Sequence, residues 1–128
     1  MSGKSSRTKG HNFEREVARR MREYYPEAKR GFQTRGGTQE ECDVEGTPFA
    51  IECKVGKRPN IRGAYNQAKC AQYEVTEQGT TRKDHRPIVV VTKKDREDTL
   101  VTIQWDMFEA FLSALKAYGR VEKAVEGL

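Results

Sequence analysis

Residues 42–55 constrain the fold more strongly than any other part of the chain. They read CDVEGTPFAIECKV, two strand-like segments joined by the turn-forming residues Gly46-Thr47-Pro48. Side chains alternate across a strand, so the apolar residues of the second segment share one face while Glu52 and Lys54 share the other. The sequence therefore predicts a β-hairpin with ionisable groups on a face that a sheet would otherwise bury.

The register of this hairpin brings acidic side chains together. With a two-residue loop at 46–47 or at 47–48, Asp43 lies on the same face as Glu52, about 4.5–8 Å away between Cβ atoms. Carboxylates at that separation repel each other unless a cation lies between them, and Mg²⁺ prefers such oxygen ligands. Lys54 on the same face can hold or deprotonate a water, or neutralise charge on a phosphate. The pattern predicts a phosphodiesterase site; the alternative is an exposed ladder in which Lys54 only pairs with an acid, worth about 0.2–1 kcal/mol.

The rest of the pattern predicts helices and strands that complete a sheet. Strands are expected at 31–35, 42–45, 49–55, 87–92 and 99–105, and helices at 12–25, at 60–75 and from 106 onward. The last helix opens with a capping box, Asp106 with Glu109, and is expected to bury its apolar side chains. Those side chains are Phe108, Phe111, Leu112 and Leu115. The order helix, three strands, helix, two strands, helix indicates one α/β domain, a mixed sheet flanked by helices.

Segments outside these elements carry further expectations. Residues 1–10 are rich in Ser, Gly, Lys and Arg and are expected to form a flexible basic tail ahead of a domain at 11–128. Residues 79–86 are expected to be a polar loop. Residues 121–128 are expected to form a last short turn or to contact a second subunit, and Trp105 is expected in the core or an interface.

Basic residues are concentrated in the first quarter of the chain. The whole chain carries +5 at pH 7, and residues 1–35 contain 10 Lys or Arg against 4 Asp or Glu. Such a field attracts a polyanion such as nucleic acid, because neutralising phosphates releases counterions. A solvated basic helix with a soluble tail explains the same charges, so charge alone leaves both interpretations open.

Cysteine spacing and hydropathy exclude several classes of protein. The three cysteines form no CxxC pair and leave an odd thiol, so reduced, packed thiols are expected rather than a disulfide framework or a zinc site. No run approaches the roughly 18 apolar residues of a membrane span, and the first residues lack the apolar centre of a signal peptide. We expect a soluble, intracellular protein.

Two motifs resemble those of a nuclease family. Asp43 followed by Glu52-Cys53-Lys54 resembles the PD-(D/E)xK nuclease signature, with Glu41-Cys42 where a proline often precedes the aspartate. The stretch KGHNFERE at 9–16 is similar to the KGxxxERE opening of the archaeal-type Holliday junction resolvases. Gly31-Phe32, Arg35 and Gly36-Gly37 are similar to the second strand and glycine-containing loop of that family. The likeness covers about residues 9–70 and implies a restriction-endonuclease-like fold.

The resemblance also implies roles for individual residues. Asp43, Glu52 and the backbone carbonyl of Cys53 would coordinate Mg²⁺, with Mn²⁺ as the alternative ion, and Lys54 would be the catalytic lysine. Glu14 would approach the metal or its water from the first helix, although an ordinary surface carboxylate explains it too. Residues implied or expected to contact DNA are Lys9, Arg15, Arg35, Gln39, Lys57, Arg58 and Arg62. The loop residues among them are equally typical of solvent contacts. Family members are commonly homodimers that cut opposing strands of a four-way junction.

Three functions are compatible with these observations. The first is a Mg²⁺-dependent, structure-selective DNA endonuclease that resembles Holliday junction resolvases and serves DNA recombination and repair. The second is a repair or replication nuclease, cellular or viral, acting on nicks, flaps or ends. The third is a non-catalytic nucleic-acid-binding protein on the same scaffold. Cleavage products on labelled DNA structures distinguish them.

Overall fold

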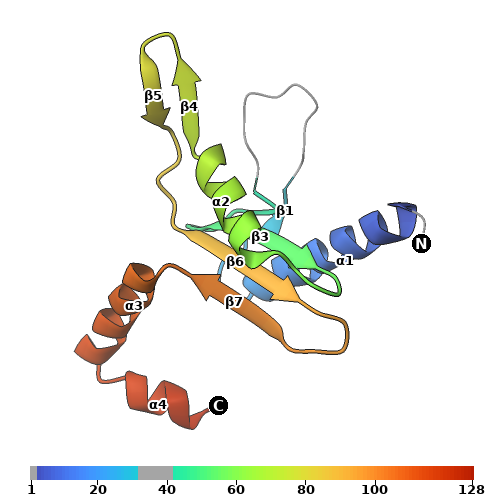
Figure 1. The fold of residues 1–128 in the computed structure, drawn as a ribbon. Coiled ribbons are helices and arrows are strands. Elements are labelled where there is room, and N and C mark those ends of the chain that lie inside the picture. The colour runs from blue at the N-terminus through green and yellow to red at the C-terminus, as the bar shows by residue number, and fades with distance from the viewer. Residues whose placement is uncertain (1–2, 32–41) are drawn as a thin grey trace.

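A five-stranded sheet with the order β1-β2-β3-β6-β7 organises the computed structural model, which describes residues 3–31 and 42–128 (Figure 1). Its strands are β1 (Lys29–Arg30), β2 (Val44–Glu45), β3 (Ala50–Val55), β6 (Ile88–Lys93) and β7 (Thr99–Ile103). β3 and β6 run parallel, and the other neighbours run antiparallel. The predicted α/β class, a mixed sheet flanked by helices, is confirmed.

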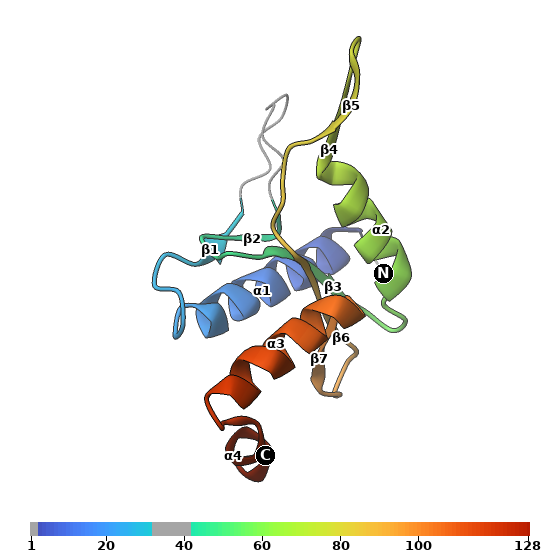
Figure 2. The same cartoon turned by 90° about the vertical axis from the view of Figure 1, so that its left-hand side faces the viewer.

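Two helices cover opposite faces of this sheet (Figure 2). α1 (Gly3–Met21) packs Phe13 and Val17 against Ile51 and its neighbours on one face. α2 (Ile61–Ala71) packs small side chains, Ala64 and Ala68, against the other face. Alternation along β3 supplies both cores, because Ile51 points to α1 while the adjacent Ala50 points to α2. No helix in the described part of the chain combines the length and apolar character needed to cross a membrane.

α1 begins at Gly3, so the prediction that residues 1–10 form a flexible tail is wrong from Gly3 onward. Extending a helix that is already nucleated costs little, and Lys and Arg are good helix formers. The added turns are also held in place, since the Lys9 ammonium forms an ion pair with Asp95 in the turn between β6 and β7. Lys9 is thereby held beside the turn between β6 and β7.

A hairpin replaces the predicted polar loop at 79–86. α2 ends at Ala71, earlier than predicted, and β4 (Tyr73–Thr76) then pairs with β5 (Gly79–Arg82), with Thr76 opposite Gly79. Figure 1 shows this hairpin projecting away from the sheet. Its residues are β-branched but polar and are exposed throughout, so no apolar face marks them as strands. Val75, the last residue of the helix predicted at 60–75, lies in β4 and is 80% exposed.

The C-terminal helices differ most from expectation. α3 (Trp105–Ala117) is followed by α4 (Val121–Glu126), which confirms a short final turn. The capping box is wrong, because α3 is capped at Gln104 without a side-chain hydrogen bond. The predicted burial is also wrong: none of the residues of α3 is buried, and Trp105 is 67% exposed. The reason is topological, since α1 and α2 already cover the two faces of the sheet.

Candidate active site

The hairpin of β2 and β3 sets the position of the two central carboxylates. Val44 pairs with Ile51, which is the register that the predicted loop at 47–48 gives. The strands stop earlier than predicted, at Glu45 and Ala50, so residues 46–49 connect them. Asp43 itself lies just before β2, outside the paired residues, and its side chain still meets Glu52. The Asp43 amide donates to the Ile51 carbonyl at 3.0 Å, so it bonds to the residue that already pairs with Val44, and the regular pairing ends there.

Asp43 and Glu52 meet directly. Their carboxyl groups share a hydrogen bond, which requires a proton on one of them. The other contact of Asp43 is to the chain itself, since the Cys53 amide donates to Asp43 Oδ2 at 2.8 Å. This bond orients the Asp43 side chain across β3, so the sheet backbone holds the pair in register.

The two carboxyl groups disfavour each other's ionisation. Burial raises the pKa of Glu52 to about 8, and the negative charge of Asp43 and their shared hydrogen bond act in the same direction. Lys54 opposes the shift and Glu14 adds to it. Two half-buried oxygen donors that keep a proton at neutral pH are a donor set that fits a hard divalent cation, which would displace that proton. A cavity of about 20 Å³ beside Glu52 leaves room for one water-sized group.

Lys54 is the third ionisable residue that the sequence predicts beside Asp43 and Glu52. It follows Glu52 by two residues, so the two side chains share a face, and the Lys54 side chain is exposed to solvent. Its positive charge favours ionised Glu52, which shows that the ammonium lies within electrostatic reach of the carboxylates. The structure thus brings an aspartate, a glutamate and a lysine together; their catalytic roles stay predictions.

Glu14 lies near this group but is held by another residue. Arg30 Nε donates to Glu14 Oε2 at 2.7 Å, and the Glu14 side chain is largely buried. Burial and Asp43 raise the pKa of Glu52 and of the Cys53 thiol, and the Glu14 charge adds to both shifts, so Glu14 lies within electrostatic reach of the site. Among the described residues, however, no group of three or more His, Cys, Asp or Glu side chains is gathered around one metal position. The structure brings together two carboxyl groups, those of Asp43 and Glu52, and the Cys53 carbonyl as a ligand stays a prediction.

Arg86 is a residue that sequence reasoning missed. Its guanidinium bonds to Asp84 at 2.9 Å, to Glu45 of β2 at 3.0 Å and to the Cys42 sulfur at 3.4 Å. These contacts tie the segment before β6 to both sides of Asp43, and hydrogen bonding to Arg86 lowers the pKa of Asp84. No signal in the sequence marks them, because Glu45 and Arg86 are far apart along the chain. Arg30, the partner of Glu14, was missed for the same reason.

The residues predicted to contact DNA lie in different environments. Lys9 pairs with Asp95, and Arg15 donates to Asn12 at 3.0 Å on the surface of α1. Lys57, Arg58 and Arg62 are exposed. Arg35 and Gln39 lie outside the described residues.

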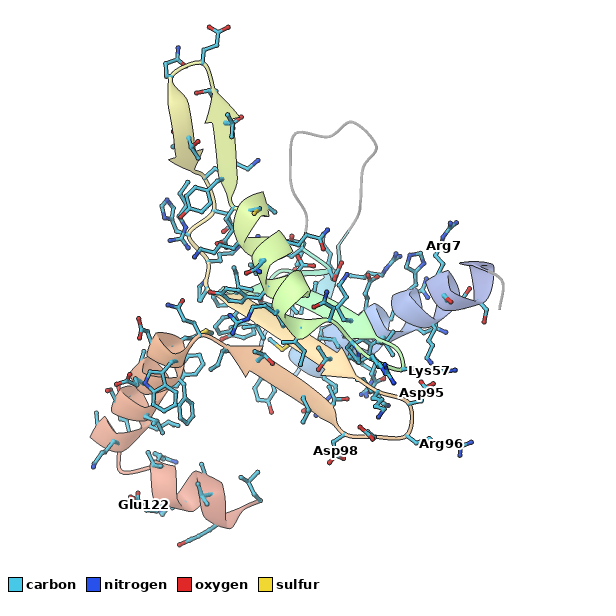
Figure 3. All side chains as sticks on the ribbon, viewed as in Figure 1. Arg7, Lys57, Asp95, Arg96, Asp98 and Glu122 are labelled. Atoms are coloured by element: carbon cyan, nitrogen blue, oxygen red, sulfur yellow. The ribbon has the colours of Figure 1, made fainter. Side chains whose placement is uncertain are left out.

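Several basic groups lie at one end of the sheet. Figure 3 shows Lys57, after β3, close to Asp95 and Arg96 of the turn between β6 and β7, with Arg7 further along α1. The hydrogen bond from Lys9 lowers the pKa of Asp95, and the positive charge of Lys57 acts in the same direction. α1 and both loops therefore present basic groups at the end of β3 that carries Lys54. Arg62 instead lines a groove between α2 and β7.

The comparisons with known proteins agree with this geometry. No curated protein and no solved structure matches the chain significantly. One family, described as "Phage putative PDDEXK endonuclease", matches residues 5–126. The match includes Asp43 and Glu52-Cys53-Lys54, the motif after which such families are named. Because it spans nearly the whole chain, the protein belongs to this family of PD-(D/E)xK endonucleases.

Proposed function

We propose that the protein is a divalent-metal-dependent DNA endonuclease that selects branched DNA and is most like a Holliday junction resolvase. Membership of an endonuclease family gives the reaction class and a DNA substrate. The observation that carries the proposal is the half-buried pair of Asp43 and Glu52 beside Lys54, in which burial and the neighbouring carboxyl group raise the pKa of Glu52. Carboxylates exposed on the surface have no such shift, whereas perturbed pKa values of this kind cluster at functional sites.

The residues at hand fit Mg²⁺ or Mn²⁺. Asp43, Glu52 and the Cys53 carbonyl would hold the ion, and PD-(D/E)xK nucleases generally use such metals. When bound, the ion supplies Lewis-acid catalysis at the phosphodiester. The Cys53 amide fixes the Asp43 carboxylate, so this ligand is oriented before any substrate arrives.

Lys54 and Glu14 act around that centre. Exposed Lys54 can neutralise charge that builds on the phosphate, and it can position the attacking water. Glu14 contributes a further negative charge from α1 and is oriented by Arg30. Together these groups flank the carboxylate pair on two elements, β3 and α1.

The choice of branched DNA rests on the KGxxxERE-like stretch and on the basic end of the sheet. Contacts from Lys9, Lys57 and Arg58 would reach phosphates, which are the same in every sequence and so favour recognition of shape. Cutting opposing strands of a junction requires a second site, so we expect the enzyme to act as a homodimer.

A cleavage panel tests the proposal. Labelled four-way, flapped, nicked and linear DNA are incubated with the protein, with Mg²⁺ or with EDTA, and products are mapped at nucleotide resolution. We expect metal-dependent cuts in the junction, and we expect Asp43→Asn and Lys54→Ala to bind the junction without cutting it. Glu109→Gln, which removes an exposed carboxylate of α3, is the matched control and should cut normally.

Other outcomes select the alternatives. Unchanged cleavage by either site variant would remove this mechanism. Single cuts at nicks, flaps or ends would indicate a repair or replication nuclease, and binding with no cleavage of any structure would indicate a non-catalytic binding protein.

A further inference from the structure

A segment with several exposed large apolar side chains lies at the β7 edge of the sheet. It runs from β7 into α3 and includes Leu100 and Val101, at 59% and 60% exposure, and Trp105, at 67%. On α3, Phe108 and Phe111 are each 42% exposed, although Phe111 touches Phe49 edge-on with ring centroids 6.3 Å apart. Figure 1 shows α3 and α4 beyond β7, on the side of the sheet away from β3. In the described part of the chain, the Phe49 contact covers one side of Phe111, and Leu100, Val101 and Trp105 stay more than half exposed.

β7 is also an edge strand without the usual protection. In the described sheet it pairs only with β6, so its outer backbone groups face solvent. Natural edge strands are normally blunted by a charge, a proline or a bulge, because a bare edge pairs with other chains. The strand Thr99-Leu100-Val101-Thr102-Ile103 contains no charge and no proline, and its pairing with β6 is regular along its length.

This strand is suited to pair with itself. Antiparallel pairing about a two-fold axis at Val101 places Val101 opposite Val101 of the second copy and Leu100 opposite Thr102. Residues opposite each other share a face, so Leu100 of the second copy would sit beside Thr102 on the side of α2. On that side a groove of about 480 Å³ is lined by Ile61, Arg62, Tyr65, Thr102, Ile103, Gln104 and Trp105. The exposed Leu100 of each chain thus meets a groove of the other.

Area and charge support a second copy as the occupant. The exposed fractions of the large apolar residues in this segment and in α4 correspond to roughly 800 Å², about one partner's share of a standard interface. Residues 99–118 include only three charged side chains, Asp106, Glu109 and Lys116, in a chain that is 34% charged. Two copies can therefore approach here without strong repulsion, despite the net charge of +5 on each.

We propose that the protein forms a homodimer in which β7 pairs antiparallel with β7 of a second copy, making one continuous sheet, with Leu100 of each chain in the groove of the other. This deepens the homodimer of the proposed function by naming its surface. It rests on the exposed segment and not on catalysis, so it can be tested without metal or DNA.

Charge substitutions at the two-fold axis test the pairing. The solution mass of the intact protein should be twice the 14.7 kDa of the chain, by light scattering or sedimentation equilibrium. Val101→Lys and Val101→Glu, each at a position exposed enough to tolerate them, place like charges opposite each other and should give monomers. An equal mixture of the two variants should give dimers again. Val75→Lys, on the exposed strand β4, is the matched control and should stay dimeric.

A cross-link gives a second and independent readout. In a Cys70→Ser background, which removes the exposed native thiol, Val101→Cys should form an intermolecular disulfide on mild oxidation. Directly opposed residues of an antiparallel pair lie about 4.5–5.5 Å apart between Cα atoms, within the range of a disulfide. Val75→Cys in the same background should not cross-link.

Monomeric wild-type protein would overturn the proposal, and so would Val101 charge variants that remain dimeric. Failure of the proposed function looks different: a dimer that assembles as described but cuts no DNA. A monomer that still cuts a junction would reject the β7 pairing and leave the nuclease intact.

Discussion

The Glu52 carboxyl makes the free energy of unfolding depend on pH within a defined range. Its pKa is about 8 in the folded protein, against an ordinary value of 4.5. Below about pH 4.5 both states hold the proton, and between the two values only the folded state does. The unfolded state then binds fewer protons, so stability without metal falls as pH rises from about 4.5 to about 8.

This fall in stability with rising pH gives a prediction for Glu52→Gln. In EDTA, the Tm of the wild-type protein should fall between pH 5 and pH 8, and the variant should lose much of that decline because its amide does not titrate. Mg²⁺ at pH 8 should raise the Tm of the wild type and leave that of the variant nearly unchanged. Thermal scans at several pH values check both points, with Glu109→Gln as the control. Parallel declines for the wild type and Glu52→Gln would contradict the buried, protonated pair.

Sequence predicts some of the residue contacts and not others. Alternation along paired strands predicts that Asp43 and Glu52 meet, and they do. The regular pairing nevertheless ends at Val44, and Cys42 and Val44 lie on opposite faces of the sheet, so the period of two does not continue through Asp43. The Arg30 bond to Glu14 and the Arg86 bond to Glu45 span 16 and 41 residues. Such contacts depend on where the sheet and helix finally lie, and a surplus of basic residues offers many equivalent partners in the sequence.

At the scale of elements, Arg86 links the segment before β6 to β2. It satisfies the partly buried carboxylates of Asp84 and Glu45, each with a side chain 24% exposed. Arg86→Ala would leave both without their cation, so we expect a loss of about 1–3 kcal/mol in the free energy of unfolding. Urea denaturation measures this, with Arg62→Ala as an exposed control. A loss no larger than that of the control would show that the network does not hold β2.

Whole elements were predictable where an apolar pattern marks them. The Ile-Val run that forms β6 and the apolar stripe of α2 each lie against a buried partner, and both were found near their predicted positions. The hairpin of β4 and β5 was missed because it has no buried face. α3 was correctly predicted as a helix, but its burial was predicted wrongly. An amphipathic pattern indicates that one face will be covered, and it does not say whether the same chain or another chain covers it.

At the scale of the whole molecule, the site and the free edge occupy different parts of one sheet. β2 and β3 carry the carboxylates, β6 lies between, and β7 ends the order. Pairing through β7 would therefore keep both sites away from the dimer axis. With adjacent strands about 4.8 Å apart, β3 and its counterpart in the second copy would be separated by about 24 Å. Two sites at that spacing could each reach one strand of a branched substrate.

Mixed dimers with one active site give the last prediction. Val101→Lys with an intact site, combined with a chain carrying Val101→Glu and Asp43→Asn, should assemble only as the mixed pair, since each variant repels itself. Such a dimer should make one nick in a symmetric four-way junction, whereas the same charge pair with both Asp43 residues intact should make paired nicks on opposing strands. Denaturing gels with each strand labelled in turn measure the difference. Paired nicks from the one-site dimer would mean that a single site cuts both strands, and the dimer would then serve binding instead of dividing the two cuts between its sites.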